Sequence, residues 1–178
     1  MVMRGQFSMK NVVLIGFMGA GKTAVGRLLA QRLNMQYLDT DEMIEKREGR
    51  TINDIFAGPG ESFFRDVESK ILDIIADVRD HVISTGGGII LRRENVLKLK
   101  GMGVVVLLWA DPGTIYERLK DTDDRPLLKA EDSRKKIKEI LDNREPIYRE
   151  TADHVVDTSG LSPEEACNRI MAFLKKEK

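Results

Sequence analysis

The chain has 178 residues, a length that suits one α/β domain with a sizeable core. Its 29 Lys and Arg residues balance 29 Asp and Glu residues, and this zero net charge argues against a nucleic-acid or polyanion partner. The single cysteine, Cys167, excludes an internal disulfide and a cysteine-based zinc site, and no apolar run is long enough to span a bilayer. We therefore expect one cytoplasmic domain over residues 1–178, without a secretory signal or a membrane partner.

Predicted strands and helices alternate along the chain. The strands are expected at 11–15, 35–38, 82–85, 104–109 and 154–156. The helices are expected at 22–33, 42–48, after the capping box of Thr51, and at 61–79, 92–99, 112–119, 133–148 and from Pro163. In helix 61–79 the stripe expected to face the core is Phe64, Val67, Ile71, Ile74, Ile75 and Val78. The alternation predicts an α/β fold whose mostly parallel sheet carries helices on both faces.

A glycine loop follows the first apolar strand. Gly16, Gly21, Lys22 and Thr23 match the pattern G-x-x-x-x-G-K-[ST] between a strand and a helix. Backbone N–H groups of such a loop point at phosphate oxygens, Lys22 would reach the β- and γ-phosphates, and Thr23 would bind Mg²⁺. The residues expected to bind a nucleotide are Gly19, Ala20, Gly21, Lys22, Thr23 and Ala24, together with Arg125 from a later loop. The alternative is a glycine-rich turn before an amphipathic helix.

Carboxylates gather at the predicted ends of parallel strands, where ligands of open α/β sheets bind. Asp39 and Asp41 lie two residues apart and face the same way in an extended chain, so one could serve Mg²⁺ and the other a substrate hydroxyl. In the alternative, Asp41 caps the next helix and Asp39 is only solvated. Asp111 also follows an apolar strand, but Pro112 directly after it favours a helix cap over a metal ligand.

Three glycines and two arginines indicate an acceptor site. Gly86 to Gly88 end a strand, where bare backbone suits close approach by a ligand, and the alternative is a flexible turn. Arg144 lies on or at the edge of the apolar stripe by which its helix faces the core, and Arg65 lies near the start of the helix at 61–79. Two such guanidinium groups could clamp a carboxylate. The alternative is internal ion pairing, for Arg65 with Glu61 or Glu68.

Arg125 lies in a polar loop at about 121–132 that suits a lid. From there it could bring positive charge to a transferring phosphoryl group, although a solvated loop arginine is equally compatible with its position. His81 and His154 match no triad or metal spacing, so we interpret both as structural.

Six motifs, taken together, resemble the shikimate kinase family. They are G-F-M-G-A-G-K-T, D-T-D, G-E-x-F-F-R-x-x-E, S-T-G-G-G, R-P-L-L and R-x-x-x-Y, and they span Gly16 to Tyr148. The resemblance implies a three-layer P-loop kinase fold, related to nucleoside monophosphate kinases, with a five-stranded parallel sheet of order 2-3-1-4-5. It also implies a substrate-binding subregion at about 39–65, a lid at about 121–132 and a loop at 157–160 that approaches the adenine.

The resemblance implies ATP-dependent phosphorylation of the 3-hydroxyl of shikimate, a step of chorismate and aromatic amino acid biosynthesis, by a monomer that uses ATP and Mg²⁺. The implied catalytic residues are Lys22, Asp41 and Arg125, with Asp41 as the proposed base. The implied shikimate-binding residues are Asp41, Arg65, Gly86, Gly87, Gly88 and Arg144. The implied magnesium ligands are Thr23 and Asp39, the latter largely through water.

Two other functions are compatible with a phosphate loop. A gluconate or nucleoside monophosphate kinase is the nearest alternative, although the paired arginines and triple glycine favour a ring carboxylate as acceptor. A GTPase-like switch would carry D-x-x-G soon after the phosphate loop and N-K-x-D later. Here D-x-x-G occurs at Asp157 to Gly160 and N-K-x-D does not occur, which argues against a switch.

Overall fold

The structure is a computed structural model that describes residues 10–120 and 132–176. Five parallel strands form one sheet in the order β2-β3-β1-β4-β5. The strands are β1 (Asn11–Ile15), β2 (Gln36–Asp39), β3 (His81–Ser84), β4 (Gly103–Trp109) and β5 (His154–Asp157). The five predicted strands and their order are therefore confirmed, with bounds that shift by one residue at most.

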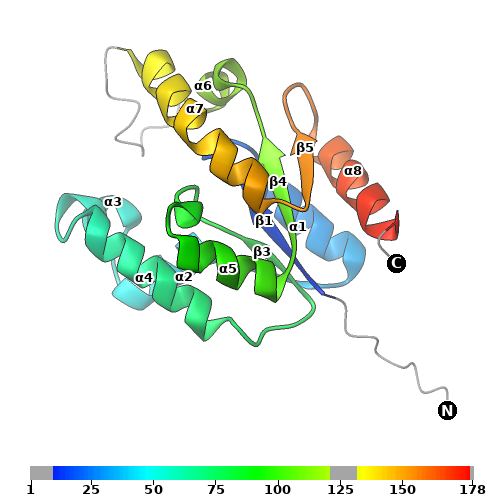
Figure 1. Cartoon of the computed structure of the whole chain (residues 1–178), viewed down its shortest axis with the longest axis horizontal. Helices are drawn as coiled ribbons and strands as arrows, with labels where there is room; N and C mark the ends of the chain where they lie inside the picture. The colour runs from blue at the N-terminus through cyan, green and yellow to red at the C-terminus, as the bar shows by residue number, and fades with distance from the viewer. Residues whose placement is uncertain (1–9, 121–131, 177–178) are drawn as a thin grey trace.

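Helices cover both faces of this sheet, as predicted (Figure 1). They are α1 (Lys22–Leu33), α2 (Thr40–Glu48), α3 (Ile52–Ala57), α4 (Glu61–Ile74), α5 (Arg93–Met102), α6 (Pro112–Leu119), α7 (Ser133–Thr151) and α8 (Pro163–Lys176), with a short 3₁₀ turn η1 (Ile89–Leu91). Among the described residues, no helix is both long and apolar enough to cross a bilayer.

Alternation along β1 separates two cores. Val12 and Leu14 pack against α1, α6 and α8, whereas Val13 and Ile15 pack against α4, α5 and η1. A third, smaller core joins α2, α3 and α4 through Ile44, Ile55, Phe64, Val67 and Ile71. The segment at about 39–65 thus has apolar support of its own beside the main sheet.

The bounds of four predicted helices need correction. Helix α2 begins at Thr40 rather than at residue 42, and α5 ends at Met102 rather than at residue 99. Helix α4 ends at Ile74 rather than at residue 79, and Ile74 is 57% exposed instead of facing the core. Val67 lies two turns earlier on nearly the same side and packs with α2 and α3, whereas Ile74 belongs to none of the three cores formed by the described residues. Helix α7 continues through Pro146 to Thr151, three residues beyond the predicted end.

Candidate active site

The loop between β1 and α1 has the conformation of a phosphate-binding loop. Its glycines adopt positive φ angles of 147° at Gly16, 77° at Gly19 and 96° at Gly21. A Cβ at Gly16 would lie 2.3 Å from the carbonyl oxygen of Leu108, so no larger residue fits there. Lys22 folds back over the loop, where its Nζ donates hydrogen bonds to the carbonyl oxygens of Gly16 at 2.7 Å and Phe17 at 2.9 Å. The ammonium group therefore already lies over the predicted phosphate site.

Asp39 ends β2 and caps α2. Its Oδ1 accepts hydrogen bonds from the backbone N–H groups of Asp41 at 2.9 Å and Glu42 at 3.4 Å, so the alternative with Asp41 as the cap is wrong. Its Oδ2 accepts a hydrogen bond from the Tyr37 hydroxyl at 3.0 Å. That hydroxyl also interacts with Thr23, and burial raises the pKa of Tyr37 to about 12. The two predicted magnesium ligands, Thr23 and Asp39, therefore both contact the Tyr37 hydroxyl. The sequence analysis did not assign Tyr37 to the site.

Asp111 serves as a helix cap. Its Oδ1 accepts a hydrogen bond from the Thr114 backbone N–H at 3.0 Å, and its Oδ2 accepts one from the Thr114 hydroxyl at 2.6 Å. The two hydrogen bonds from Thr114 lower the pKa of Asp111 to about 2. Because both oxygens stabilise the start of α6, the cap interpretation is confirmed.

Gly86 lies where two acidic side chains converge. Its backbone N–H donates a hydrogen bond to the hydroxyl of buried Thr40 at 3.1 Å. A Cβ at Gly86 would lie 2.7 Å from Oδ1 of Asp41 and 2.8 Å from Oε1 of Glu68. Gly86 therefore leaves room for two carboxyl groups of the protein itself. A flexible turn would not require such close packing against the glycine. Thr40, the middle residue of D-T-D, is a positioning contact that sequence reasoning missed.

Arg65 is held by its own helix and lies against the triple glycine. It forms ion pairs with Glu61 at 3.0 Å and Glu68 at 2.7 Å, as the alternative interpretation anticipated. Its side chain is only 12% exposed, and a Cβ at Gly88 would lie 2.3 Å from Nη2 and 2.4 Å from Nη1. The guanidinium group is thus both paired and fixed against the bare backbone of the predicted acceptor site.

Arg144 and Tyr148 reach the same glycines from α7. Nη1 of Arg144 donates to the carbonyl oxygen of Gly87 at 3.3 Å, and the Tyr148 hydroxyl donates to the same oxygen. Burial raises the pKa of Tyr148 to about 12, so this hydroxyl stays a donor. On the other side, a Cβ at Gly87 would lie 3.3 Å from the backbone N of Met18 in the phosphate loop. One turn of α7 therefore links the acceptor side to the donor side.

These groups form one electrostatic cluster. The charges of Asp41, Arg65 and Arg144 all act on the pKa of Glu68. The structure therefore brings together the predicted acceptor-binding side chains, and Glu68 lies among them. Two cationic groups beside a carboxylate and bare backbone can bind a molecule that carries both a carboxylate and hydroxyls. Arg125 and the predicted lid at about 121–132 lie outside the described residues, apart from position 132.

The loop after β5 is fastened to the phosphate loop. The Thr158 hydroxyl lies 3.1 Å from the carbonyl oxygen of Ala20. Arg118 donates to the carbonyl oxygen of Gly19 at 3.0 Å and to that of Thr158 at 2.7 Å. Sequence reasoning did not assign Arg118 or Thr158, because the partners of each lie far away in the chain.

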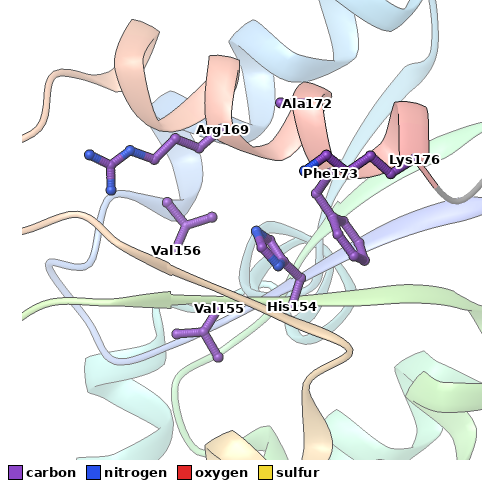
Figure 2. Close-up of a pocket in the computed structure, with 7 residues that line it drawn as sticks. All are labelled: His154, Val155, Val156, Arg169, Ala172, Phe173 and Lys176. Atoms are coloured by element: carbon purple, nitrogen blue, oxygen red, sulfur yellow. The ribbon is translucent and has the colours of Figure 1, made fainter.

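A pocket of about 360 Å³ lies elsewhere, between β5 and the C-terminal half of α8 (Figure 2). His154 lines it and stacks on Phe173, with ring centroids 4.1 Å apart. This contact agrees with the structural interpretation of His154. None of the residues predicted for the nucleotide or the acceptor lines this pocket.

The β1–α1 phosphate loop, the strand order and the acceptor cluster beside the loop define an α/β P-loop kinase. A model of the shikimate kinase family matches residues 18–175. The chain belongs to the shikimate kinase family and is therefore a kinase-family enzyme. A shikimate kinase of Thermodesulfovibrio yellowstonii is 50% identical over 163 residues, which cover 92% of this chain and 94% of the relative.

Solved structures agree with this assignment. A shikimate kinase from Acinetobacter baumannii in complex with shikimate superposes with a TM-score of 0.91 at 36% identity, covering 96% of this chain and 95% of that one. A shikimate kinase from Aquifex aeolicus superposes with a TM-score of 0.80 at 38% identity, covering 94% of this chain and 97% of that one. The predicted fold and family are both confirmed.

Proposed function

We propose that this chain transfers the γ-phosphoryl group of ATP to the 3-hydroxyl of shikimate, giving shikimate 3-phosphate and ADP. This reaction is a step of chorismate and aromatic amino acid biosynthesis. Family membership supports the proposal, as does the similarity to a relative solved in complex with shikimate. The observation that carries it furthest is the cluster of Asp41, Arg65 and Arg144 around Gly86 to Gly88, directly beside the phosphate loop.

On the acceptor side, Arg65 and Arg144 bind the carboxylate of shikimate through charge-assisted hydrogen bonds. Backbone groups of Gly86 to Gly88 help to bind the same carboxylate. Asp41 accepts a hydrogen bond from the 3-hydroxyl and orients or deprotonates it. Because the two arginines hold the carboxylate and Asp41 holds the hydroxyl, the acceptor is bound in one orientation. Orientation is the larger part of catalysis in phosphoryl transfer.

On the donor side, backbone N–H groups from Gly19 to Ala24 and the N-terminus of α1 bind the phosphates of ATP. Lys22 exchanges its two carbonyl partners for the β- and γ-phosphate oxygens. Arg125 adds positive charge at the transferring group. These groups stabilise charge without a covalent intermediate on the protein.

Thr23 and Asp39 fit a magnesium ion. Both offer hard oxygen atoms, and both converge on the Tyr37 hydroxyl. Among the described residues, no group of three or more His, Cys, Asp or Glu side chains could enclose a metal by itself. Such a sparse site suits Mg²⁺, which keeps several waters and binds substrate phosphates. When bound, Mg²⁺ neutralises charge on the β- and γ-phosphates, while the hydrogen bond from Tyr37 keeps the Asp39 carboxylate oriented.

A coupled ADP-release assay tests the function. Shikimate, gluconate and several nucleoside monophosphates are compared as acceptors under the same conditions. We expect ATP-dependent ADP release with shikimate at least about 100-fold above the others in kcat/KM, because only shikimate offers a ring carboxylate to the two arginines. Comparable or greater release with gluconate or a nucleotide would contradict the assignment and favour another small-metabolite kinase.

Ligand-dependent proteolysis tests the proposed lid with Arg125. Cleavage within residues 121–132 is expected to slow by about tenfold or more when ATP and shikimate are both saturating, because bound ligands favour the closed form. Cleavage elsewhere in the chain provides the internal reference. A cleavage rate at 121–132 that is insensitive to the two ligands would argue against a lid.

We also propose a monomeric enzyme that acts in the cytoplasm without a nucleic-acid or membrane partner. The balance of 29 basic and 29 acidic residues supports the absence of a polyanion partner. The monomer and the location stay predictions.

A further inference from the structure

Glu68 is the most completely buried acid of the candidate site. Its side chain is 0% exposed, and it lies on α4 between the apolar neighbours Val67 and Ile71. A carboxylate in such surroundings is costly unless it is paired or protonated. The mechanism above does not use Glu68, so its burial beside the acceptor site needs an explanation.

The two oxygens of Glu68 have different surroundings. Oε2 accepts a hydrogen bond from Nη1 of Arg65 at 2.7 Å. Oε1 is buried and makes no hydrogen bond among the described residues. Oε1 and Oδ1 of Asp41 both face the same bare point of Gly86, within 2.8 Å and 2.7 Å of where a Cβ would lie. One oxygen thus anchors an arginine, and the other lies at Gly86 together with a carboxyl oxygen of Asp41.

The titratable and charged groups around Glu68 come from three helices. Arg65 is on its own helix, Asp41 is on α2, and Arg144 and Tyr148 are on α7. Burial is the main cause that raises the pKa of Glu68, to about 7, and the negative charge of Asp41 adds to it. Arg65 and Arg144 act in the opposite direction. Near neutral pH, Glu68 is therefore present both with and without its proton.

We propose that Glu68 is a positioning residue that carries a proton on Oε1 in the complex with shikimate. This inference rests on the proposed function. The proton is presented toward Asp41, while Oε2 keeps its hydrogen bond with Arg65. A protonated Glu68 removes the repulsion between two adjacent carboxylates, so Asp41 keeps its place beside the acceptor hydroxyl.

Acceptor binding then favours protonation of Glu68. The carboxylate of shikimate brings a further negative charge to Arg65 and Arg144, the two cations that stabilise ionised Glu68. When the positive charge of the two arginines is shared between the shikimate carboxylate and Glu68, ionised Glu68 is stabilised less and its proton affinity rises. Shikimate binding therefore takes up a proton at any pH at which free Glu68 is already ionised, which means above about 7. By the same linkage, affinity for shikimate falls as pH rises, by up to about tenfold per pH unit.

Calorimetric titration with shikimate alone tests this directly. The binding enthalpy is measured at about pH 6, 7 and 8, each in several buffers of different ionisation enthalpy. The dependence of the enthalpy on the buffer yields the number of protons taken up on binding. We expect little uptake at the lowest pH and close to one proton per chain, about 0.9, at the highest. Binding without uptake at every pH would overturn this inference and leave the proposed function intact, whereas no binding at all would overturn both.

Two variants assign the proton. Glu68→Gln keeps the shape of a protonated Glu68, so it is expected to bind shikimate without proton uptake and with an affinity that no longer falls above neutral pH. Glu61→Gln is the matched control, because Glu61 is the other ion-pair partner of Arg65 but is 60% exposed. It should keep the proton uptake. Equal uptake in Glu68→Gln and the wild type would assign the proton to another group and refute the proposal.

Discussion

Replacement of Asp41 by asparagine is expected to lower kcat by about 10²- to 10⁴-fold, the range that removal of a general base produces. Asparagine keeps the size of the side chain and its place beside Gly86, but it cannot take a proton from the acceptor hydroxyl. The KM for ATP should change little, because Asp41 lies at Gly86 and acts on Glu68, on the proposed acceptor side of the site. Steady-state kinetics with each substrate varied in turn measures both quantities.

Asp142→Asn is the control for Asp41→Asn. Asp142 is exposed on α7 and pairs with Lys138 on its own helix, so its replacement should leave kcat within about twofold of the wild type. If Asp41→Asn raised only the KM for ATP, the residue would belong to the nucleotide side. In that case the proposed acceptor geometry would be wrong.

Replacement of Arg144 by alanine is expected to lower kcat/KM for shikimate by about 10²- to 10³-fold, equivalent to about 3–4 kcal/mol. The change removes one of the two cations that we propose to bind the acceptor carboxylate, together with the hydrogen bond to the Gly87 carbonyl. ATP binding should persist, since the phosphate loop keeps Lys22 and its backbone donors. Kinetics with varied shikimate, and calorimetry with ATP alone, separate the two effects.

Arg149→Ala is the matched control on the same helix. Arg149 has a side chain that is 47% exposed and pairs with Glu145 one turn away. Its loss removes the same charge from α7 but none of the contacts to the triple glycine, so turnover should stay close to that of the wild type. Near-normal turnover of Arg144→Ala at low shikimate would refute the carboxylate-binding role.

Local signals explain why several elements were predicted to the residue. Helix α1 runs over Lys22–Leu33 as predicted, since the glycine loop marks its start and apolar residues recur at helical spacing. Strand β1 also has the predicted bounds, Asn11–Ile15. The capping box of Thr51 and Asp54 is formed, as short-range hydrogen bonds between neighbouring residues usually are.

The pattern of apolar residues along a helix predicts burial less reliably where a neighbouring element decides which side of the helix is covered. Ile74 fits the apolar stripe of its helix, yet it is exposed and belongs to none of the cores formed by the described residues. Glu68 was considered only as an ion-pair partner of Arg65, yet it is fully buried. Hydrophobicity predicts which residues prefer the core, but the positions of α2, α3 and Gly86 determine which side of α4 is covered.

The sequence by itself determined the phosphate loop, the alternation of strands and helices, and the residue types of an acceptor site. Each of these depends on contacts within a few residues, or on spacing along one element. The structure alone decided which of two local caps forms, since Asp39 rather than Asp41 caps α2. It also decided that Tyr37 joins Asp39 to Thr23 and that Glu68 lies with Asp41 at Gly86. The last two depend on segments brought together by the sheet and its helices, and such proximity leaves no periodic trace in the chain.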